Sequence, residues 1–233
     1  MRTFHFKHFS ILHNEYSLPF GTDAMMLGAL VQHDSPSRIL DAGAGCGVLG
    51  LMMAQRFPQA LVTCIEVDAK SADECYKNVE SSPFHDRIQV IHDDLLNPSV
   101  LEYDLIISNP PYYFTDNSSS LRNSIQKHSN SEAFSAWIRA CFSLLSETGS
   151  YWMIYPSDQL ELIAPCTGSN DFHEFKRITL LNQHNEAVRT ISAYSKQAVR
   201  LEEQHVLLRN HDGTYTSQYL ELTKDLHSKK PLK

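Results

Sequence analysis

The chain has 233 residues, of which 42% are hydrophobic and 20% are charged, and this is the composition of an ordinary globular protein. Its length suits one well-buried domain with modest appendages and is short for two full domains. No apolar run reaches the roughly 18 residues that a membrane span needs. The N-terminus also lacks the apolar core of a signal peptide. We therefore expect a cytoplasmic, monomeric protein that does not enter a membrane.

The cysteines and histidines bear on redox state and metal binding. The five cysteines are odd in number and form no CxxC pair, which predicts free thiols in a reducing compartment. The twelve histidines show no HExxH or other ligand spacing. The sequence thus predicts neither a disulfide framework nor a metal site.

The net charge of −7 is unevenly distributed along the chain. Residues 34–110 hold 5 Lys and Arg against 12 Asp and Glu, a net of −7, whereas residues 171–233 hold 10 against 8, a net of +2. An RNA enzyme needs a local basic patch rather than a basic total. The C-terminal third is therefore compatible with RNA, although a lysine-rich tail is also typical of a solvated terminus.

Short apolar runs alternate with helical stretches from residue 38 onward. Strands are expected at 39–40, 61–65, 88–91, 103–108 and 151–155, and helices at 48–56, 69–79 and 133–145. This alternation predicts parallel strands joined by crossover helices, so the fold class is α/β, Rossmann-like and doubly wound. Shorter connections then separate three further strands, at 176–181, 189–194 and 205–208. We expect a mostly parallel, seven-stranded sheet with an antiparallel edge.

We treat residues 1–233 as one domain with three parts. Residues 34–160 are the expected cofactor-binding core, residues 1–33 an N-terminal extension over the active site, and residues 161–233 the C-terminal antiparallel strands and tail. The segment 109–130 is polar, rich in Ser and Asn, and directly follows an expected strand. It predicts a long loop of the kind that often serves as a functional lid.

A glycine-rich turn, DAGAGCG, follows the first strand of this series and opens a helix. Gly43, Gly45 and Gly47 allow a tight turn that a ligand can approach closely, and the helix N-terminus offers free N–H groups. Glycines also occur in ordinary strand-to-helix turns, but this position in a βαβ series is typical of nucleotide-type ligands. With Asp41 two residues before the first glycine, the pattern resembles motif I of class I methyltransferases. In that resemblance the turn holds the amino-acid end of S-adenosylmethionine, and Asp41 approaches the ligand through it.

Two acidic positions predict the rest of the cofactor site. In this fold an acidic residue about 20 residues further on binds the ribose hydroxyls, because its two ionised oxygens can accept from both. Glu66 occupies that place, while the alternative, Asp68, is better placed to cap the next helix. After the third strand, Asp94 is our candidate for the adenine amino group, and Asp93 equally suits the cap of a helix beginning at Leu95.

The sequence NPPY, Asn109 to Tyr112, directly follows the expected strand YDLIIS. Neither proline can donate to a strand ladder, so the pair ends the strand in a rigid turn at the sheet edge where ligands bind. The flanking Asn and Tyr make a plain strand-ending turn the weaker interpretation. The motif resembles motif IV of amino-methyltransferases, which methylate a planar nitrogen.

This resemblance implies a role for each residue of the motif. The lone pair of an exocyclic adenine amine is delocalised into the ring, and acceptors at Asn109 and the Pro110 carbonyl would favour a pyramidal nitrogen. Because the sulfonium is already a strong leaving group, positioning carries most of the catalysis. Tyr112 is expected to stack on the extruded base. Further substrate contacts are expected from Pro111, Tyr113 and Phe114.

The resemblance extends beyond these two motifs. FHFKHF and FGTDAMMLGAL, ahead of the glycine turn, together with IEVD, DLIISNPPYY and GSYWMIYP, are similar to the bacterial valine-tRNA adenine-N6-methyltransferase family. That family methylates adenosine 37, next to the anticodon, which implies tRNA as partner and S-adenosylmethionine as cofactor. It also implies that Thr22 and Asp23 pack over the cofactor or target pocket, with a purely structural turn as the alternative.

Candidate cations for the RNA phosphates accompany this resemblance. Lys7 and Arg189 are the substrate contacts we single out. Other candidates are Arg122, Lys127, Lys176, Arg177, Lys196, Arg200 and Arg209.

Three other functions share parts of the pattern. NPPY also serves guanine N2 in ribosomal RNA, in enzymes that often carry a duplicated domain, and the side-chain amide of a glutamine in release factors. The protein-modifying enzymes carry a helical docking domain before the glycine turn, but only 40 residues precede Asp41. A non-enzymatic binding module would have to retain Glu66, Asp94 and Asn109 without using them.

Overall fold

The computed structural model describes residues 2–13, 21–97, 101–110, 122–160, 163 and 172–228. Its helices are α1 (Thr22–Leu30), α2 (Val48–Arg56), α3 (Ala69–Glu80), α4 (Arg122–Ser143) and α6 (Ser217–Thr223), with 3₁₀ turns η1 (His85–Arg87) and η2 (Ser157–Gln159). Its strands are β1 (Arg2–His5), β2 (Ser10–His13), β3 (Arg38–Ala42), β4 (Leu61–Glu66), β5 (Ile88–His92), β6 (Tyr103–Ser108), β7 (Leu145–Pro156), β8 (His173–Leu181), β9 (Ala187–Ser195) and β10 (Glu202–Leu207). None of the described helices is both long and apolar enough to cross a membrane.

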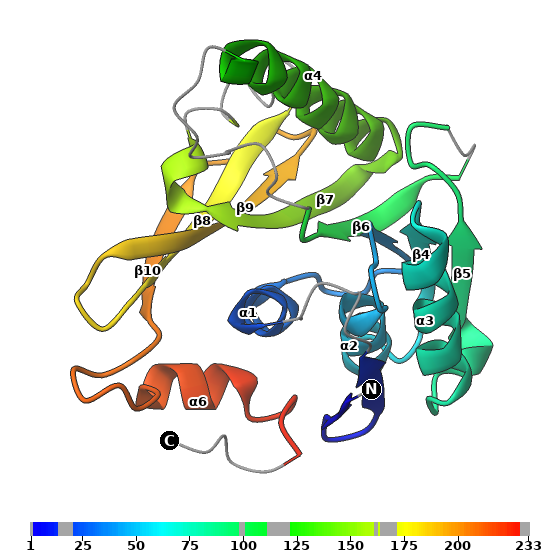
Figure 1. Cartoon of the computed structure of the whole chain (residues 1–233), viewed down its shortest axis with the longest axis horizontal. Coiled ribbons are helices and arrows are strands. Elements are labelled where there is room, and N and C mark those ends of the chain that lie inside the picture. The colour runs from blue at the N-terminus through cyan, green and yellow to red at the C-terminus, as the bar shows by residue number, and fades with distance from the viewer. Residues whose placement is uncertain are drawn as a thin grey trace.

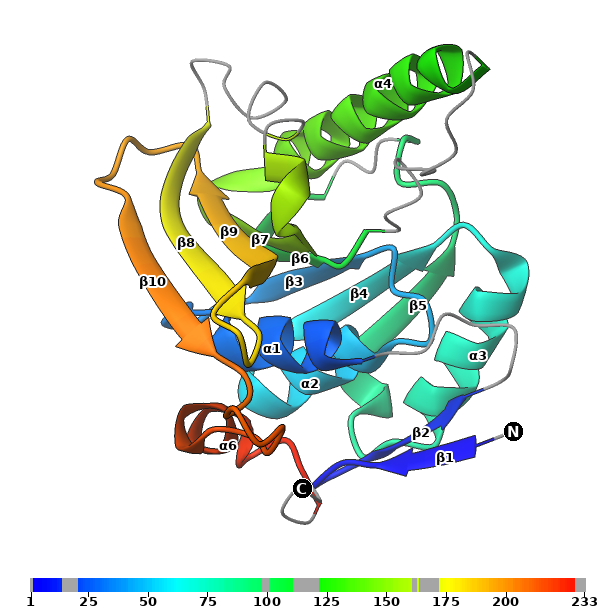
Figure 2. The same cartoon turned by 60° about the vertical axis from the view of Figure 1, so that its left-hand side comes forward.

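The main sheet has the strand order β10-β8-β9-β7-β6-β3-β4-β5 (Figure 1). The five strands from β7 to β5 in this order pair in parallel, which confirms the doubly wound α/β class. The chain extends from β3 through β4 to β5 on one side and then returns to place β6 on the other side of β3 (Figure 2). This reversal creates the switch point at which open α/β sheets bind ligands, beyond the carboxyl ends of β3 and β6.

Among the described residues the sheet has eight strands, so the expected number of seven is wrong. The expected antiparallel pairing toward this edge is confirmed at β9, which runs antiparallel to both β7 and β8, whereas β10 pairs with β8 in parallel. Ser195, at the end of β9, lies beside His173, at the start of β8. Residues 196–201 therefore cross the end of the sheet at the start of β8, and β10 then runs along the free edge of β8 in the same direction.

The expected loop at 109–130 is also partly wrong. α4 begins at Arg122, so residues 122–130 are helical, while residues 111–121 lie outside the described part of the chain. The C-terminal half of α4 buries Phe134, Ile138 and Cys141 against the sheet. Starting a helix is the costly step, and this packing supplies it. Further turns then add at little cost, so the tertiary contacts override the loop preference of the Ser/Asn-rich sequence.

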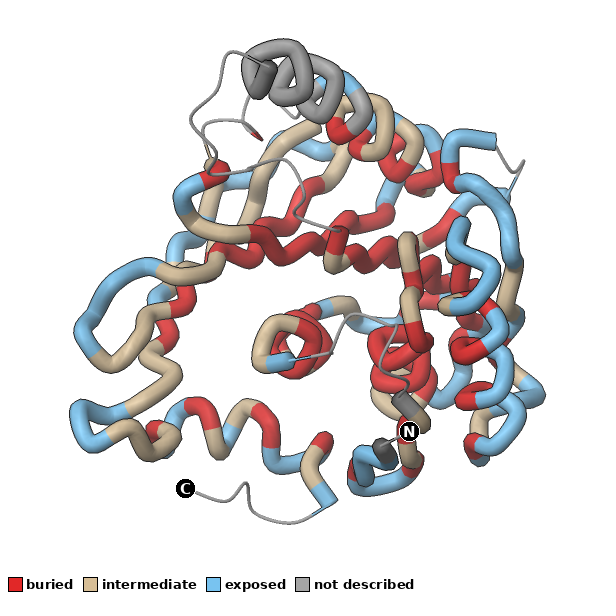
Figure 3. The backbone as a smooth tube through the Cα atoms, viewed as in Figure 1, coloured by how far each residue is buried: buried red, intermediate tan, exposed pale blue. Residues whose placement is uncertain are grey.

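Two apolar clusters cover the two faces of the sheet. α1, α2, α3 and α6 lie on one side together with the β1–β2 hairpin, and α4 lies on the other (Figure 1). The central strands are buried on both faces, as Figure 3 shows by the red run along the sheet. Parallel strands buried on both faces need near-continuous apolar sequence, which accounts for the runs in β6 and β7.

Asn78 of α3 joins three parts of the fold. Its side chain accepts from the Leu12 N–H at 2.7 Å and donates to the Leu12 carbonyl at 3.1 Å, which holds β2 against α3. It also donates to the Cys46 carbonyl in the glycine turn at 2.9 Å. Asn78 is fully buried, so each of these backbone groups depends on it for a partner.

We expect Asn78→Ala to lower the free energy of unfolding by about 3 kcal/mol, because it leaves the buried Cys46 carbonyl and two half-buried backbone groups of Leu12 unpaired. Urea unfolding followed by circular dichroism measures this change. Asn97→Ala, which removes an exposed asparagine, is the matched control and should change stability by less than about 0.5 kcal/mol. Equal stability of the two variants would show that Asn78 does not hold the hairpin and the turn.

Candidate active site

The glycine turn after β3 is tied to the end of β4. The N–H groups of Gly43 and Ala44 both donate to the Ile65 carbonyl, at 2.9 and 3.0 Å. The Gly45 N–H donates to Glu66 Oε2 at 2.8 Å. These bonds fix the turn directly beside the Glu66 carboxylate.

All three motif glycines adopt left-handed backbone, with φ of 71° at Gly43, 54° at Gly45 and 83° at Gly47. At Gly47 a Cβ would also lie 2.6 Å from the Cys75 sulfur, so both backbone and packing exclude other residues there. A Cβ at Gly45 would meet no atom within 4 Å. The turn is therefore packed against α3 on one side and open on the side that Gly45 presents.

The thiols behind the turn are packing groups. Cys46, Cys64 and Cys75 are free and buried, as is Cys141 on the other face of the sheet. Burial raises the pKa of Cys46 to about 12, which keeps this thiol protonated and unreactive. The fifth cysteine, Cys166, lies outside the described residues.

Asp41 lies beneath the turn and is only 1% exposed. Its Oδ2 accepts from the Gly50 N–H at 2.7 Å, whereas its Oδ1 is buried without a hydrogen-bond partner among the described residues. Burial raises the pKa of Asp41 to about 7, the Gly50 bond opposes that rise, and the nearby charge of Glu66 adds to it. Asp41 thus has an unsatisfied oxygen and titrates near neutrality.

We expect the stability that Asp41 contributes to fall as pH rises. Its pKa is about 7 in the folded chain against the ordinary 3.8 of an aspartate, so between these values the folded state retains a proton that the unfolded state has lost. The contribution is fully present below about pH 4 and is lost through pH 7, by up to roughly 4 kcal/mol.

Urea unfolding of the protein and of Asp41→Asn at pH 4, 5, 6 and 7 measures this slope. The stability of the protein relative to the variant should decrease with pH. Asp68→Asn serves as control, since the Ser71 hydrogen bonds lower the pKa of exposed Asp68 and its contribution to stability changes only below about pH 4, so the difference should stay nearly constant over this range. A flat difference for Asp41→Asn would mean that the carboxyl is ionised throughout.

Glu66 and Asp68 occupy different environments at the end of β4. Glu66 Oε1 accepts from the Asp68 N–H at 2.9 Å and Oε2 accepts from Gly45, so both oxygens are held in place with further lone pairs free. Asp68 caps α3 by accepting from the Ser71 N–H at 2.8 Å. The expected cap is confirmed, and Glu66 is the acidic residue that faces the glycine turn.

Asp93 and Asp94 shape a turn after β5. Asp93 Oδ1 accepts from the Asp94 N–H at 2.7 Å and from the Asn97 side chain at 3.1 Å. Asp94 Oδ1 accepts from the Leu96 N–H at 3.0 Å. A turn rather than a helix follows at 95–97, so the helix expected from Leu95 is wrong. Both side chains are exposed, and Asp94 keeps one oxygen that makes no hydrogen bond to the described chain.

The NPPY segment begins beside the glycine turn. Ser108 at the end of β6 pairs with Ala42 at the end of β3, so Asn109 and Gly43 leave neighbouring strands at the same level. Asn109 is half-buried and Pro110 is buried. The substrate contacts expected at 111–114 (Pro111, Tyr112, Tyr113 and Phe114) lie outside the described residues. The structure thus brings the two motifs together at the switch point.

Asp23 and Arg189 meet at the same edge of the sheet. Asp23 follows Thr22 in the first turn of α1, and its Oδ2 accepts from Arg189 Nε at 2.7 Å. Arg189 of β9 pairs with Pro156, the last residue of β7. This ion pair joins a predicted cofactor contact to a predicted substrate contact, although the two residues are 166 positions apart.

Most of the cations expected to bind phosphate are paired with carboxylates. Lys7 lies in the β1–β2 hairpin and contacts Asp225 at 2.8 Å, so its ion pair ties it to the segment after α6 and not to either motif. The other ion pairs are Lys176–Glu202, Arg177–Glu174, Arg177–Glu203 and Lys196–Glu147. The side chains of Arg122 and Lys127 are outside the described part. The basic excess of the C-terminal third is therefore largely neutralised locally.

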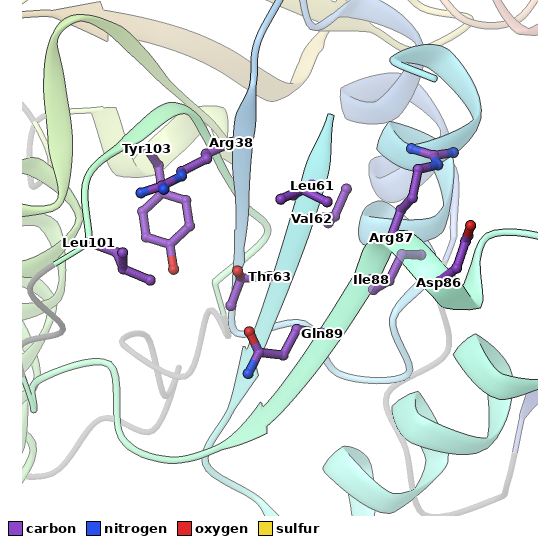
Figure 4. A pocket seen from close by; sticks show the side chains of 10 residues that line it. All are labelled: Arg38, Leu61, Val62, Thr63, Asp86, Arg87, Ile88, Gln89, Leu101 and Tyr103. Carbon is purple, nitrogen blue, oxygen red and sulfur yellow. The ribbon is translucent and has the colours of Figure 1, made fainter. Parts of the chain in front are cut away.

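A cavity of about 270 Å³ lies at the amino ends of the central strands, opposite to the ends that carry the two motifs (Figure 4). Its lining includes Arg38, Leu61, Ile88 and Tyr103, which are the first residues of β3, β4, β5 and β6. Both motifs follow the last residues of their strands, so this cavity is not the cofactor site.

The residues at the switch point fit S-adenosylmethionine. The turn is open at Gly45, Glu66 holds two oriented oxygens beside it, and Asp41 has a buried oxygen that still lacks a donor. Sequence reasoning missed Asn78, whose signal is a polar residue on the apolar face of α3 beside Cys75 and Val79. Among the described residues no cluster of ligating side chains could hold a metal ion.

Comparisons with known proteins agree with this geometry. Residues 15–160 match the methyltransferase small domain family. A tRNA1(Val) (adenine(37)-N6)-methyltransferase of Vibrio parahaemolyticus is 31% identical over 229 residues, covering 97% of this chain and 95% of that protein. A protein of the same name from Dyadobacter fermentans is 32% identical over 233 residues, covering 97% of each.

A solved structure supports the fold independently. The crystal structure of a predicted O-methyltransferase from Agrobacterium tumefaciens has a TM-score of 0.70 at 23% identity, covering 87% of this chain and 96% of that one. This likeness shows the class I methyltransferase fold, whose methyl donor is S-adenosylmethionine. The full-length similarity and the match over residues 15–160 show that the chain belongs to the methyltransferase small domain family and, within it, to the bacterial valine-tRNA adenine-N6-methyltransferase family.

Proposed function

We propose that the chain transfers a methyl group from S-adenosylmethionine to the N6 amino group of adenosine 37, next to the anticodon of valine tRNA. The observation that carries this proposal is the pairing of Ala42 with Ser108, which sets the NPPY segment beside the glycine turn. An amine held by the first motif residue would face a methyl donor held by the turn. The names of full-length relatives support adenine in tRNA as the acceptor.

The acceptor residues act by positioning. S-adenosylmethionine supplies an electrophilic methyl group on a sulfonium. The Asn109 side-chain oxygen and the Pro110 carbonyl accept the two N–H groups of the amine and turn its lone pair toward that methyl group. Tyr112 stacks on the base, with Pro111, Tyr113 and Phe114 beside it. The sulfonium is a good leaving group, so this geometry needs no strong general base.

The remaining residues hold the cofactor and the RNA. Glu66 accepts from the ribose hydroxyls and Asp94 from the adenine amine of the cofactor, while Asp41 supports its amino-acid end through the turn. At the edge of the site, Thr22 and Asp23 cover the cofactor, and Asp23 orients Arg189 toward a phosphate. Lys7 would contact an RNA phosphate only at the periphery of the tRNA-binding surface, because its ion pair with Asp225 ties it to the segment after α6.

We expect Asn109→Ala to lower kcat for tRNA methylation at least about 100-fold, because it removes an acceptor that orients the amine. Binding of S-adenosylmethionine, measured by calorimetry, should change less than about twofold. The assay uses tRNA that lacks the modification and quantifies methylated nucleosides by mass spectrometry. Asn210→Ala, an exposed asparagine near α6, is the matched control.

The product identifies the acceptor. N6-methyladenosine that disappears in Asn109→Ala supports the proposal. Methylguanosine, or methyl label that appears only with ribosomal RNA or a protein glutamine, would replace it with one of the alternatives. Equal loss of methyl transfer and cofactor binding would remove the role assigned to Asn109.

We expect Glu66→Ala to weaken S-adenosylmethionine binding by roughly 10- to 100-fold, because a carboxylate that accepts from ligand hydroxyls contributes about 1.5–3 kcal/mol. Asp68→Ala is the control, since it removes only the cap of α3. That variant should lose some stability and keep its affinity for the cofactor. The opposite result would make Asp68 the ribose ligand.

We infer a cytoplasmic monomer. Free buried cysteines are compatible with a reducing compartment. Size-exclusion chromatography with light scattering measures the oligomeric state.

A further inference from the structure

Among the described residues, three buried polar groups between α4 and the sheet make no contact with full hydrogen-bond geometry: Ser108 Oγ, Trp137 Nε1 and Tyr151 OH. Ser108 is the last residue of β6, Tyr151 lies in β7, and Trp137 lies in α4. Ile106 of β6 pairs with Tyr151, and both belong to the apolar cluster beneath α4. Ser108, two residues after Ile106, points to the same face.

The three groups converge on the Tyr151 hydroxyl. Ser108, Trp137 and Cys141 each lie near enough to this hydroxyl to act on its pKa as weak hydrogen-bond partners, although none of these contacts has the distance and angle of a formed hydrogen bond. Burial is the largest effect and raises the pKa of Tyr151 well above its ordinary value, so the hydroxyl stays protonated and can donate. Ser108 and Tyr151 are both 0% exposed, so bulk water does not satisfy them.

Packing alone does not account for the hydroxyl of Tyr151. Its ring packs edge-on against Phe142, with 5.5 Å between ring centroids, and a phenylalanine would keep that contact. A buried hydroxyl without a partner destabilises the folded chain relative to an apolar group of the same shape. Buried polar groups without a partner are typical of functional sites, where an unfavourable local structure is part of the mechanism.

This cluster touches both motifs. Ser108 is joined by its peptide bond to Asn109, the first residue of NPPY. The Trp137 ring lies against the glycine turn, because a Cβ at Gly43 would be 3.0 Å from Cη2 and 3.3 Å from Cζ2 of the indole. One side chain of α4 therefore spans the distance between the cofactor turn and the polar group beneath the acceptor motif.

We infer that Ser108, Trp137 and Tyr151 form a positioning network that sets Asn109 relative to the glycine turn during methyl transfer. The chemistry of the groups gives one order for its bonds: the Trp137 N–H donates to the Tyr151 oxygen, and the Tyr151 O–H donates to Ser108 Oγ. In the structure these contacts fall short of hydrogen-bond geometry, and substrate binding would bring the groups into it. The inference rests on the proposed function and adds residues that do not contact the substrate.

Tyr151→Phe tests the network. We expect kcat for tRNA methylation to fall about tenfold, while KM for tRNA and affinity for S-adenosylmethionine stay within about twofold. The urea midpoint should stay the same or rise, because the variant removes an unsatisfied buried group. Ser108→Ala should act in the same direction, and the double variant should lose no more activity than the more impaired single variant.

Tyr155→Phe is the matched control. Tyr155 lies on the same strand and the same face as Tyr151, but its hydroxyl shares a hydrogen bond of 2.8 Å with Ser192 Oγ. Its loss should lower the urea midpoint and leave kcat unchanged. A structural role and a positioning role therefore predict opposite patterns in two buried tyrosines four residues apart.

Two outcomes would overturn the network. In one outcome, Tyr151→Phe has the same kcat as the wild-type protein. In the other, the variant loses both stability and activity. A chain that binds S-adenosylmethionine but does not methylate tRNA refutes the proposed function instead. The same variants are then compared on the ribosomal RNA or protein that takes label from the cofactor, where the network predicts the same separation of stability from kcat.

Discussion

The hydrogen bonds between the glycine turn and the end of β4 are the constraint on which the rest of the site depends. Gly43 and Ala44 share the Ile65 carbonyl, and Gly45 donates to the Glu66 carboxylate. The backbone that makes these bonds is left-handed at each motif glycine, which is costly for other residues. The turn is therefore held in one conformation, with the Glu66 carboxylate, our proposed ribose ligand, bonded directly to it. Trp137 of α4 packs against this turn, and the NPPY segment begins beside it.

The electrostatics of the chain follow from the same arrangement. The acidic block of residues 34–110 contains the glycine turn with Glu66 and Asp94, and burial raises the pKa of Asp41 there to about 7. Most of the described basic residues of the C-terminal third are tied to carboxylates, among them Arg189 to Asp23. All these pairs keep partly exposed side chains, and ion pairs at a surface are each worth at most about 1 kcal/mol, so an RNA phosphate can compete for the cation. An acidic chain can in this way bind a polyanion through cations that exchange partners.

Four of the seven buried side-chain atoms that lack a hydrogen-bond partner among the described residues lie near the two motifs. They belong to Asp41 below the glycine turn and to Ser108, Trp137 and Tyr151 between α4 and the sheet. The other three belong to His33, Gln55 and His227, which lie away from both motifs in the chain. On the strand of Tyr151, Tyr155 shows that the fold can satisfy a buried tyrosine, because Ser192 provides a partner.

Local pattern alone determines much of this protein. It predicts α2 and β6 with their bounds, because an apolar run between turn signals leaves few other conformations. It also identifies the glycine turn, NPPY and the cap at Asp68, since each depends on neighbours within a few residues. Tertiary structure decided the parallel pairing of β10, the early start of α4 and the contacts of Asn78, Arg189 and Trp137. Those contacts join residues up to 166 positions apart, and no local pattern specifies which distant groups meet once the sheet has closed over its core.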